Sequence, residues 1–136
     1  MRDEEELSDA NYAALAEFRY ALRQFHAFSE NGAAVVGLTP QQHQALLAIR
    51  GSGAANVTVG YVAERLILKP HSATGLVDRH QALGLVTRSP SPDDGRQALL
   101  HLTPKALGLL RKLSQTHREE ILRLRPMLRE LLNRID

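Results

Sequence analysis

The sequence of 136 residues contains no cysteine, which excludes a disulfide scaffold, a thiolate zinc finger and a thiol redox sensor. It has no apolar run near the ~20 residues that cross a bilayer, and its acidic start is unlike a signal peptide. We therefore expect a cytoplasmic protein with no membrane partner. Hydrophobic residues make up 43% and charged residues 24%, a composition typical of a folded domain and not of a disordered chain.

Charge is distributed unevenly along the chain, although the net charge is only +2. Residues 1–30 hold seven acidic and three basic residues, and Arg50 is the one charged residue between Ala33 and Val62. Basic side chains then gather between Arg79 and Lys112. Because a weak net charge does not identify a polyanionic partner, the position of this basic segment is the more informative feature.

Apolar spacing predicts a first long helix over residues 8–30, which Asn31 and Gly32 would end. A second helix is expected to begin at the segment Thr39-Pro40-Gln41-Gln42. Here Thr39 can cap the helix, Pro40 suits its first position and Gln42 completes a capping box.

Two short helices and a hairpin are expected next. The helices span 59–66 and 70–83, and strand-like runs follow at 85–88 and 97–102. The intervening residues 89–95 are rich in Ser, Pro, Asp and Gly, which form turns. This order predicts a mainly α winged helix-turn-helix whose wing is the small β-hairpin.

The C-terminal segment carries an apolar seam at alternating steps of three and four over 107–135, interrupted by Ser114 and His117. Such a seam suits helix pairing. Because proline disrupts a helix interior, we expect one helix to about Arg125 and a second, short helix after Pro126.

A winged helix-turn-helix presents the second helix of its helix-turn-helix pair to the DNA major groove, and a cation on the wing can reach the minor groove. In this chain that helix is the one expected at 70–83. The candidate DNA-contacting residues on and beside it are Lys69, His71, Ser72, Thr74, Gly75, Asp78 and Arg79. Those of the wing are Arg88, Ser91, Asp94, Gly95 and Arg96. An arginine in an isolated hairpin turn is more often a solvated surface residue. Beside a helix-turn-helix, however, the minor-groove role is favoured for Arg96.

The chain resembles the MarR family of winged-helix transcription regulators. The resemblance rests on residues 76–79, 84–88, 94–96 and 102–106, and extends over nearly the whole chain. It implies a single MarR-like domain over 1–136, with a DNA-binding lobe at 33–105 and dimerisation helices at 7–30 and 106–136. It also implies that Arg96 enters the minor groove while Asp94 orients it.

The resemblance implies an obligate two-fold homodimer. The apolar seam agrees, because one small lobe cannot cover two long flanking helices, although an intramolecular core seam is the alternative. The candidate interface residues are Leu7, Tyr12, Leu113, Ile121, Leu124, Leu128, Leu131 and Leu132.

Many family members are repressors that small, often aromatic and acidic ligands release. Phe18, Phe25, His26 and His43 are candidates for such a pocket, with core or dimer packing as the alternative for the phenylalanines. Because no two histidines lie three to five residues apart, no local metal-ligand pair exists, and we expect no metal or cofactor.

The sequence departs from the family pattern at two positions of the fourth helix. His80 stands where an apolar residue is usual, and we expect a partly buried histidine with its hydrogen bonds satisfied. Gly75 stands where a larger polar residue is common, and it costs roughly 1 kcal/mol of helix propensity relative to alanine.

Taken together, these features predict a homodimeric repressor that binds a pseudo-palindrome in double-stranded DNA, with a possible small-molecule effector. The alternative is a winged-helix module that binds protein, because the exposed face of the helix expected at 70–83 is polar and carries little charge. An enzyme is not expected: no nucleophile–base pair or phosphate loop is evident, and Asp93-Asp94 lacks the rigid setting that tunes a catalytic carboxylate.

Overall fold

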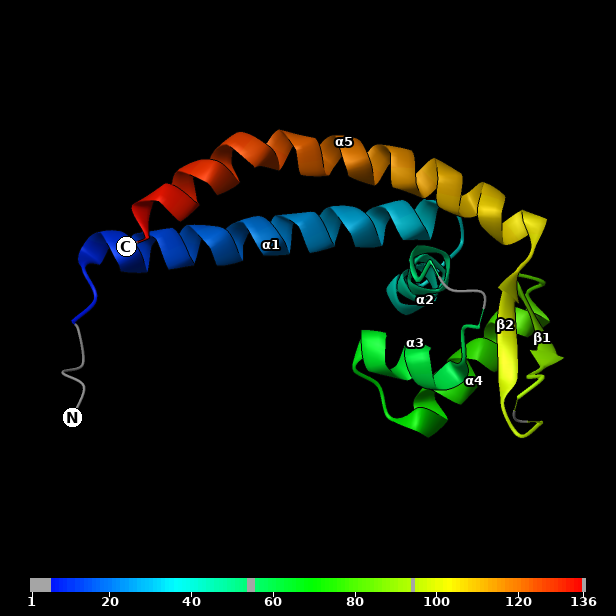
Figure 1. Cartoon of the computed structure of the whole chain (residues 1–136). Helices are drawn as coiled ribbons and strands as arrows, with labels where there is room; N and C mark the ends of the chain where they lie inside the picture. The colour runs from blue at the N-terminus through cyan, green and yellow to red at the C-terminus, as the bar shows by residue number, and fades with distance from the viewer. Residues whose placement is uncertain (1–5, 54–55, 94, 136) are drawn as a thin grey trace, which may run out of the picture. The chain divides into compact units, whose positions relative to one another are not determined.

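The computed structural model describes residues 6–53, 56–93 and 95–135. Within them, the expected mainly helical chain with one β-hairpin is confirmed (Figure 1). The elements, in chain order, are α1 (Asp9–Val35), α2 (Pro40–Gly51), α3 (Val59–Leu66), α4 (Pro70–Ala82), β1 (Val86–Pro90), β2 (Ala98–Leu102) and α5 (Pro104–Arg134).

The chain divides into two compact units. One is Gly32–Ser114, and the other combines the segment before Gly32 with the segment after Ser114. The first of these, called the lobe below, reaches further along the chain than the expected 33–105. The reason is that the first turns of α5 contribute Ala106, Leu110 and Leu113 to its core.

The start of α2 has the predicted capping box. The Gln42 N–H donates to Thr39 Oγ1 at 3.1 Å, and the Thr39 N–H donates to Gln42 Oε1 at 3.0 Å. Two of the unpaired N–H groups at this end are thereby satisfied. The helix places the fully buried Leu46 in the core, beside Ala45 and Ile49.

The helix-turn-helix follows directly. Thr58 caps α3 by accepting from the Tyr61 N–H at 3.2 Å. Ile67 ends α3 in the left-handed region, with φ at 55°, and its side chain is 92% exposed. This conformation is unfavourable for a β-branched residue, and it turns the chain so that α4 can begin at Pro70.

The end of α4 is closed by a Schellman motif. Gly84 has φ at 72°, the Leu85 N–H donates to His80 O at 2.9 Å, and the Gly84 N–H donates to Gln81 O at 3.0 Å. Lys105 Nζ adds a 3.0 Å hydrogen bond to the carbonyl oxygen of Leu83. These backbone and side-chain hydrogen bonds together fix the C-terminal end of α4.

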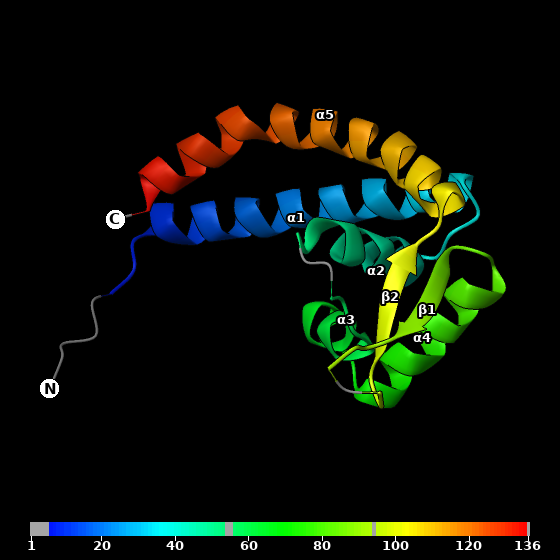
Figure 2. The same cartoon turned by 45° about the vertical axis from the view of Figure 1, so that its right-hand side comes forward.

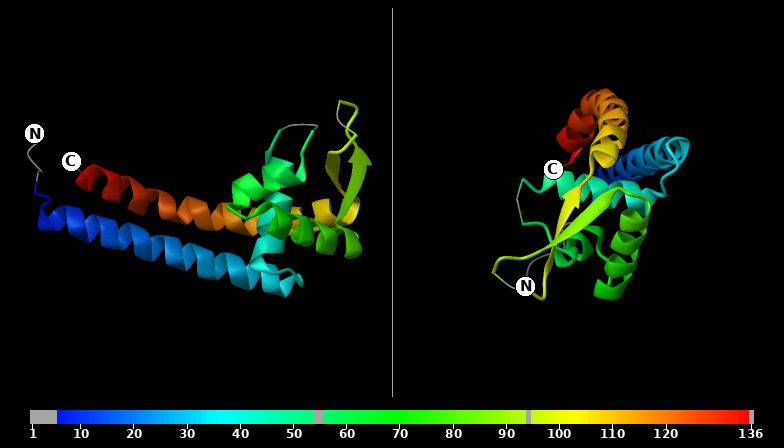
Figure 3. Two further views of the ribbon diagram at one scale, coloured as in Figure 1. Left: turned by 90° about the horizontal axis from the view of Figure 1, so that it is seen from below. Right: turned by 90° about the vertical axis from the view of Figure 1, so that its right-hand side faces the viewer.

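The wing is an antiparallel pair in which Val86 lies opposite Leu102 and Pro90 opposite Ala98. Ser89 and Pro90 thus belong to β1 and not to the tip, contrary to the expected strand end at Arg88. Proline is tolerated there because it ends an edge strand. The Leu100 N–H donates to Val57 O at 2.8 Å, which fastens β2 to the lobe. Figure 2 shows the hairpin beside α4, and Figure 3 shows it as a twisted ribbon.

In the other unit, α1 and α5 run side by side (Figures 1 and 3). The expected end of α1 at Asn31-Gly32 is wrong, because the helix continues to Val35. Ala33 is fully buried in the lobe core, and a Schellman motif at Gly37 ends the helix instead: the Leu38 N–H donates to Ala33 O at 2.9 Å.

The expected break of the C-terminal helix at Pro126 is also wrong, since α5 is continuous to Arg134. Proline removes one backbone hydrogen bond, to the carbonyl oxygen of Leu122. Leu122 and Pro126 both lie on the exposed side of the helix, so solvent can satisfy that oxygen.

The unit built from α1 and α5 buries little of its apolar surface within one chain. Phe25 and Phe28 pack edge-on against His117, with ring centroids 5.9 and 5.4 Å away. Other large apolar side chains are 38–68% exposed: Leu7, Tyr12, Leu15, Phe18, Tyr20, Leu22, Ile121, Leu122, Leu132 and Ile135. In the part of the chain that the structure describes, no helix has the length and apolarity needed to span a bilayer.

Candidate nucleic-acid interface

The recognition helix α4 has one buried and one exposed face. Ala73, Leu76, Val77 and His80 are buried against the lobe. The solvent side carries the polar residues that the sequence predicts as DNA contacts: Lys69, His71, Ser72, Thr74, Asp78 and Arg79 are exposed, and Gly75 is half-buried. The structure thus leaves this face available to a partner.

The N-terminus of α4 lacks a side-chain cap. Lys69 occupies the N-cap position and makes no capping hydrogen bond, and Pro70 has no N–H. The first intrahelical bond runs from the Ala73 N–H to Lys69 O at 3.1 Å. The N–H groups of His71 and Ser72 therefore point out of the helix end, where a phosphate could accept from them with help from the helix dipole and the Lys69 ammonium.

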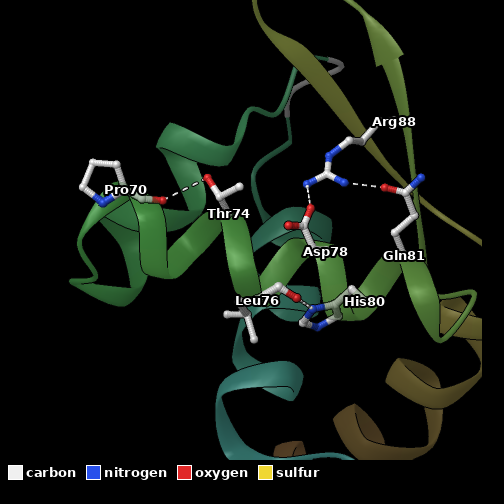
Figure 4. Close-up of polar contacts among 7 residues, drawn as sticks. All are labelled: Pro70, Thr74, Leu76, Asp78, His80, Gln81 and Arg88. Atoms are coloured by element: carbon white, nitrogen blue, oxygen red, sulfur yellow. Dashed lines mark hydrogen bonds and ion pairs between the residues drawn. The ribbon is translucent and has the colours of Figure 1, made fainter.

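The hydroxyl of Thr74 is less available as a hydrogen-bond donor to DNA than its exposure suggests. Its Oγ1 donates to the carbonyl oxygen of Pro70 at 3.1 Å (Figure 4). The hydroxyl keeps its acceptor lone pairs, so it can still receive a hydrogen bond from a base amino group. This bond fixes the side-chain orientation and favours an acceptor role over a donor role.

Gly75 leaves open space on the solvent side of α4. A Cβ at this position would meet its nearest heavy atom, Arg79 Nη1, at 4.0 Å, which is ordinary van der Waals contact. The Arg79 guanidinium therefore lies beside the bare backbone of Gly75.

We expect Gly75→Ala to raise the free energy of unfolding by up to about 1 kcal/mol, because alanine has the higher helix propensity and meets no clash. Chemical denaturation would measure this. Gly84→Ala is the matched control, and it should destabilise because Gly84 has φ at 72°. A destabilised Gly75→Ala variant would contradict the prediction.

Arg88 ties the wing to the recognition helix. Its Nη2 forms an ion pair with Asp78 Oδ1 at 2.7 Å, and its Nη1 donates to Gln81 Oε1 (Figure 4). Asp78 therefore pairs with the strand residue Arg88. The side chain of Arg88 is 24% exposed, and the pair orients β1 along α4 while neutralising an acidic charge on the exposed face of α4.

The wing turn carries the remaining candidates. Gly95 and Arg96 are exposed, Ser91 is half-buried, and the Ser91 N–H donates to Gln97 O at 3.0 Å to close the turn. Asp94 lies outside the described residues, so its expected role in orienting Arg96 stays a prediction. The wing thus places an arginine at the tip of a hairpin that Arg88 anchors to α4.

His80 is a buried polar link between α4 and α2. It is 1% exposed, its Nδ1 lies 2.7 Å from Leu76 O, and its Nε2 lies 2.9 Å from Gln42 O. Sequence reasoning expected a partly buried histidine, whereas the structure buries His80 fully, and it did not identify Gln42 as a partner. The contact between Nε2 and the carbonyl oxygen of Gln42 joins α4 to the capped start of α2.

The remaining predicted residues are placed as follows. Leu113 and Leu131 are buried within the single chain, whereas the other candidate interface residues are exposed or half-buried. Phe18 is exposed, Phe25 packs on His26 and His117, and His43 is buried in α2. No group of three metal-ligating side chains exists among the described residues.

Two helices joined by a tight turn, with an exposed second helix and an adjoining hairpin, define a winged helix-turn-helix protein. A sequence model of the MarR family matches residues 36–97. A probable transcriptional regulator from Pseudomonas aeruginosa is 30% identical, with a TM-score of 0.64, and the match covers 86% of this chain and 92% of that one. The chain belongs to the MarR family of transcription regulators.

Two further solved structures share the fold. AbsC, a MarR family transcriptional regulator from Streptomyces coelicolor, is 18% identical with a TM-score of 0.71, covering 95% of this chain and 99% of AbsC. A mutant of S. aureus MepR bound to an oligodeoxyribonucleotide is 17% identical with a TM-score of 0.67, covering 96% of this chain and 86% of MepR. No curated protein matches this chain in sequence.

Proposed function

We propose that this protein binds double-stranded DNA as a homodimer and represses nearby genes from the cytoplasm. The observation that carries the proposal is the exposed face of α4, with two unbonded N–H groups at its start, beside a hairpin that holds Arg96 at its tip. An exposed helix and an arginine-tipped wing on one lobe suit adjacent major and minor grooves. The MepR structure, which contains an oligodeoxyribonucleotide, supports the same use of the fold.

The homodimer is supported by the apolar surface that one chain leaves uncovered. Tyr12, Ile121 and Leu132 are each at least 50% exposed on the unit formed by α1 and α5. Exposed apolar surface of this kind marks an association surface. A two-fold dimer would present two α4 helices to successive major grooves, about one helical turn apart.

The protein acts by binding and requires neither catalytic chemistry nor a cofactor. Of the carboxylate pair considered from the sequence, Asp93-Asp94, Asp94 lies outside the described residues and Asp93 is exposed to solvent. Release of DNA is then a change in affinity that a small effector can bring about if it binds the free and DNA-bound states unequally.

Selection of bound fragments from the source genome, followed by mobility-shift titration, tests the proposal. We expect a pseudo-palindrome, with affinity falling by about 10³-fold or more between about 50 and 200 mM salt if the dimer neutralises six or more phosphates. Equal affinity for unrelated duplexes, or salt-insensitive binding to a protein with no retention on DNA, would overturn it and favour a protein-interaction module.

A further inference from the structure

Thr74 lies on the exposed face of α4, in the first half of the helix. The helix begins at Pro70, and the exposed side chains of His71 and Asp78 lie three residues before Thr74 and four residues after it. Side chains at these spacings share one side of a helix, whereas Ala73 is fully buried against the lobe. Because a recognition helix contacts base edges chiefly through its N-terminal residues, Thr74 is in a position to read a base in the major groove.

An internal hydrogen bond decides how the Thr74 hydroxyl can interact with a base. Thr74 Oγ1 donates to the carbonyl oxygen of Pro70 at 3.1 Å (Figure 4). A hydroxyl has one proton and two lone pairs, so this bond uses the proton and leaves the lone pairs available. The bond also strengthens the hydroxyl as an acceptor, because linked hydrogen bonds polarise one another. To donate to DNA instead, Thr74 would first have to give up its bond to Pro70.

The polar side chain nearest along this face does not disturb the arrangement. The carboxylate of Asp78, one turn further on, accepts from Arg88 Nη2 on Oδ1 at 2.7 Å and leaves the Thr74 proton with Pro70 (Figure 4). Among the described residues, no donor is bonded to Thr74 Oγ1. The bond to Pro70 also holds the side chain in one rotamer, so accepting a proton from a base requires little further ordering.

Gly75 keeps the surface of α4 low beside Thr74. Outside the neighbouring backbone, a Cβ at Gly75 would meet its nearest heavy atom, Arg79 Nη1, only at 4.0 Å. The threonine side chain is short, so a base can reach its oxygen only where the helix backbone lies close to the base edges. Glycine permits such a close approach. The surface at residues 74–75 therefore combines a fixed acceptor with the room that a base needs to reach it.

The four bases differ in what they offer such an acceptor in the major groove. Adenine N6 and cytosine N4 carry amino protons, whereas guanine O6 and thymine O4 are themselves acceptors. A fixed acceptor bonds to an amino group, but opposite a carbonyl oxygen both groups lose their hydrogen bonds to water and gain none. We infer that Thr74 selects an amino-bearing base, adenine or cytosine, at one position of each half-site and rejects guanine and thymine there. The inference rests on the proposed binding of DNA and names the residue and the chemical group that set one position of the operator.

Selection from a randomised duplex library compares the full wild-type chain with two variants. Thr74→Ser keeps the hydroxyl and should keep the preference for adenine or cytosine, whereas Thr74→Val replaces the hydroxyl by a methyl group and should lose the preference at that position.

The amino group itself is then removed from the wild-type operator, by purine in place of the selected adenine or by 2-pyrimidinone in place of the selected cytosine. With both half-sites changed, we expect wild-type binding to weaken by about tenfold to 100-fold, because each half-site loses one hydrogen bond. The same change should alter the affinity of Thr74→Val by less than about twofold. Weaker base pairing affects both chains alike, so it cancels in this double-mutant cycle.

Thr116→Val is the matched control, because it makes the same exchange at an exposed threonine of α5 outside the lobe, and it should behave as the wild-type chain does. Circular dichroism checks that each variant is folded. With the wild-type chain binding a selected DNA, three results would overturn the inference alone: an unchanged base preference in Thr74→Val, guanine or thymine preferred at the position that this variant affects, or an equal loss in both chains when the amino group is removed. A wild-type chain with no sequence preference would overturn the proposed function as well.

Discussion

Arg96→Ala should weaken operator binding by about 30-fold to about 10⁴-fold and leave the dimer folded. An arginine that reaches base edges contributes about 1–3 kcal/mol, and a two-fold dimer loses that contact twice, so the expected loss is about 2–6 kcal/mol. The residue lies in the exposed turn between β1 and β2, apart from the core of the lobe. Its removal should therefore change DNA affinity with little change in unfolding free energy.

A mobility-shift titration on the selected DNA measures this loss, with circular dichroism as the test of folding. Arg118→Ala is the control, because Arg118 is an exposed arginine of α5 outside the lobe. Both variants lose one positive charge per chain, so a general charge effect would weaken them equally. Wild-type affinity in Arg96→Ala would remove the wing from the DNA interface.

Helix starts proved more predictable from sequence than helix ends. Thr39, Gln42 and Thr58 cap α2 and α3 through bonds to residues three positions away, and such local chemistry is legible in the sequence. The end of α1 was less predictable, because both Gly32 and Gly37 can end a helix. The helix continues past Gly32 because Ala33 is buried in the lobe core, and that burial depends on residues distant in the chain.

Two other features of the fold, the continuity of α5 and the conformation of Ile67, also depend on the three-dimensional environment of the residues. α5 passes through Pro126 because its one lost hydrogen bond falls on a solvated face. Ile67 takes a left-handed conformation that sequence reasoning would assign to glycine, because the turn between α3 and α4 requires it. Neither the solvated face nor the turn geometry can be read from residue identity alone.

In the candidate site, too, some features follow from the local sequence and others depend on contacts between elements distant in the chain. The polar face of α4 and the arginine at the wing tip follow from periodicity and turn composition, and the structure leaves both exposed. The ion pair between Arg88 and Asp78 depends on how the hairpin lies against the helix, and sequence reasoning placed Arg88 only among the DNA-contacting residues of the wing.

The link through His80 leads to the second large expected effect, which is on stability. His80→Ala should lower the free energy of unfolding by about 2–4 kcal/mol, since it opens a cavity in a site that is 1% exposed and removes the bond to Gln42 O. His80→Leu keeps most of the side-chain volume and should cost only about 1 kcal/mol. The difference between the two variants separates packing from hydrogen bonding.

Urea denaturation of the full chain measures these values, with His71→Ala as the control on the exposed face of the same helix. His71→Ala should change the unfolding free energy by no more than about 0.5 kcal/mol, because surface substitutions without special contacts rarely do more. If His80→Ala were as mild as His71→Ala, the contact between α4 and α2 would not depend on the imidazole. A destabilised His80→Leu close to His80→Ala would instead assign the stability to the hydrogen bonds, because both variants lack them.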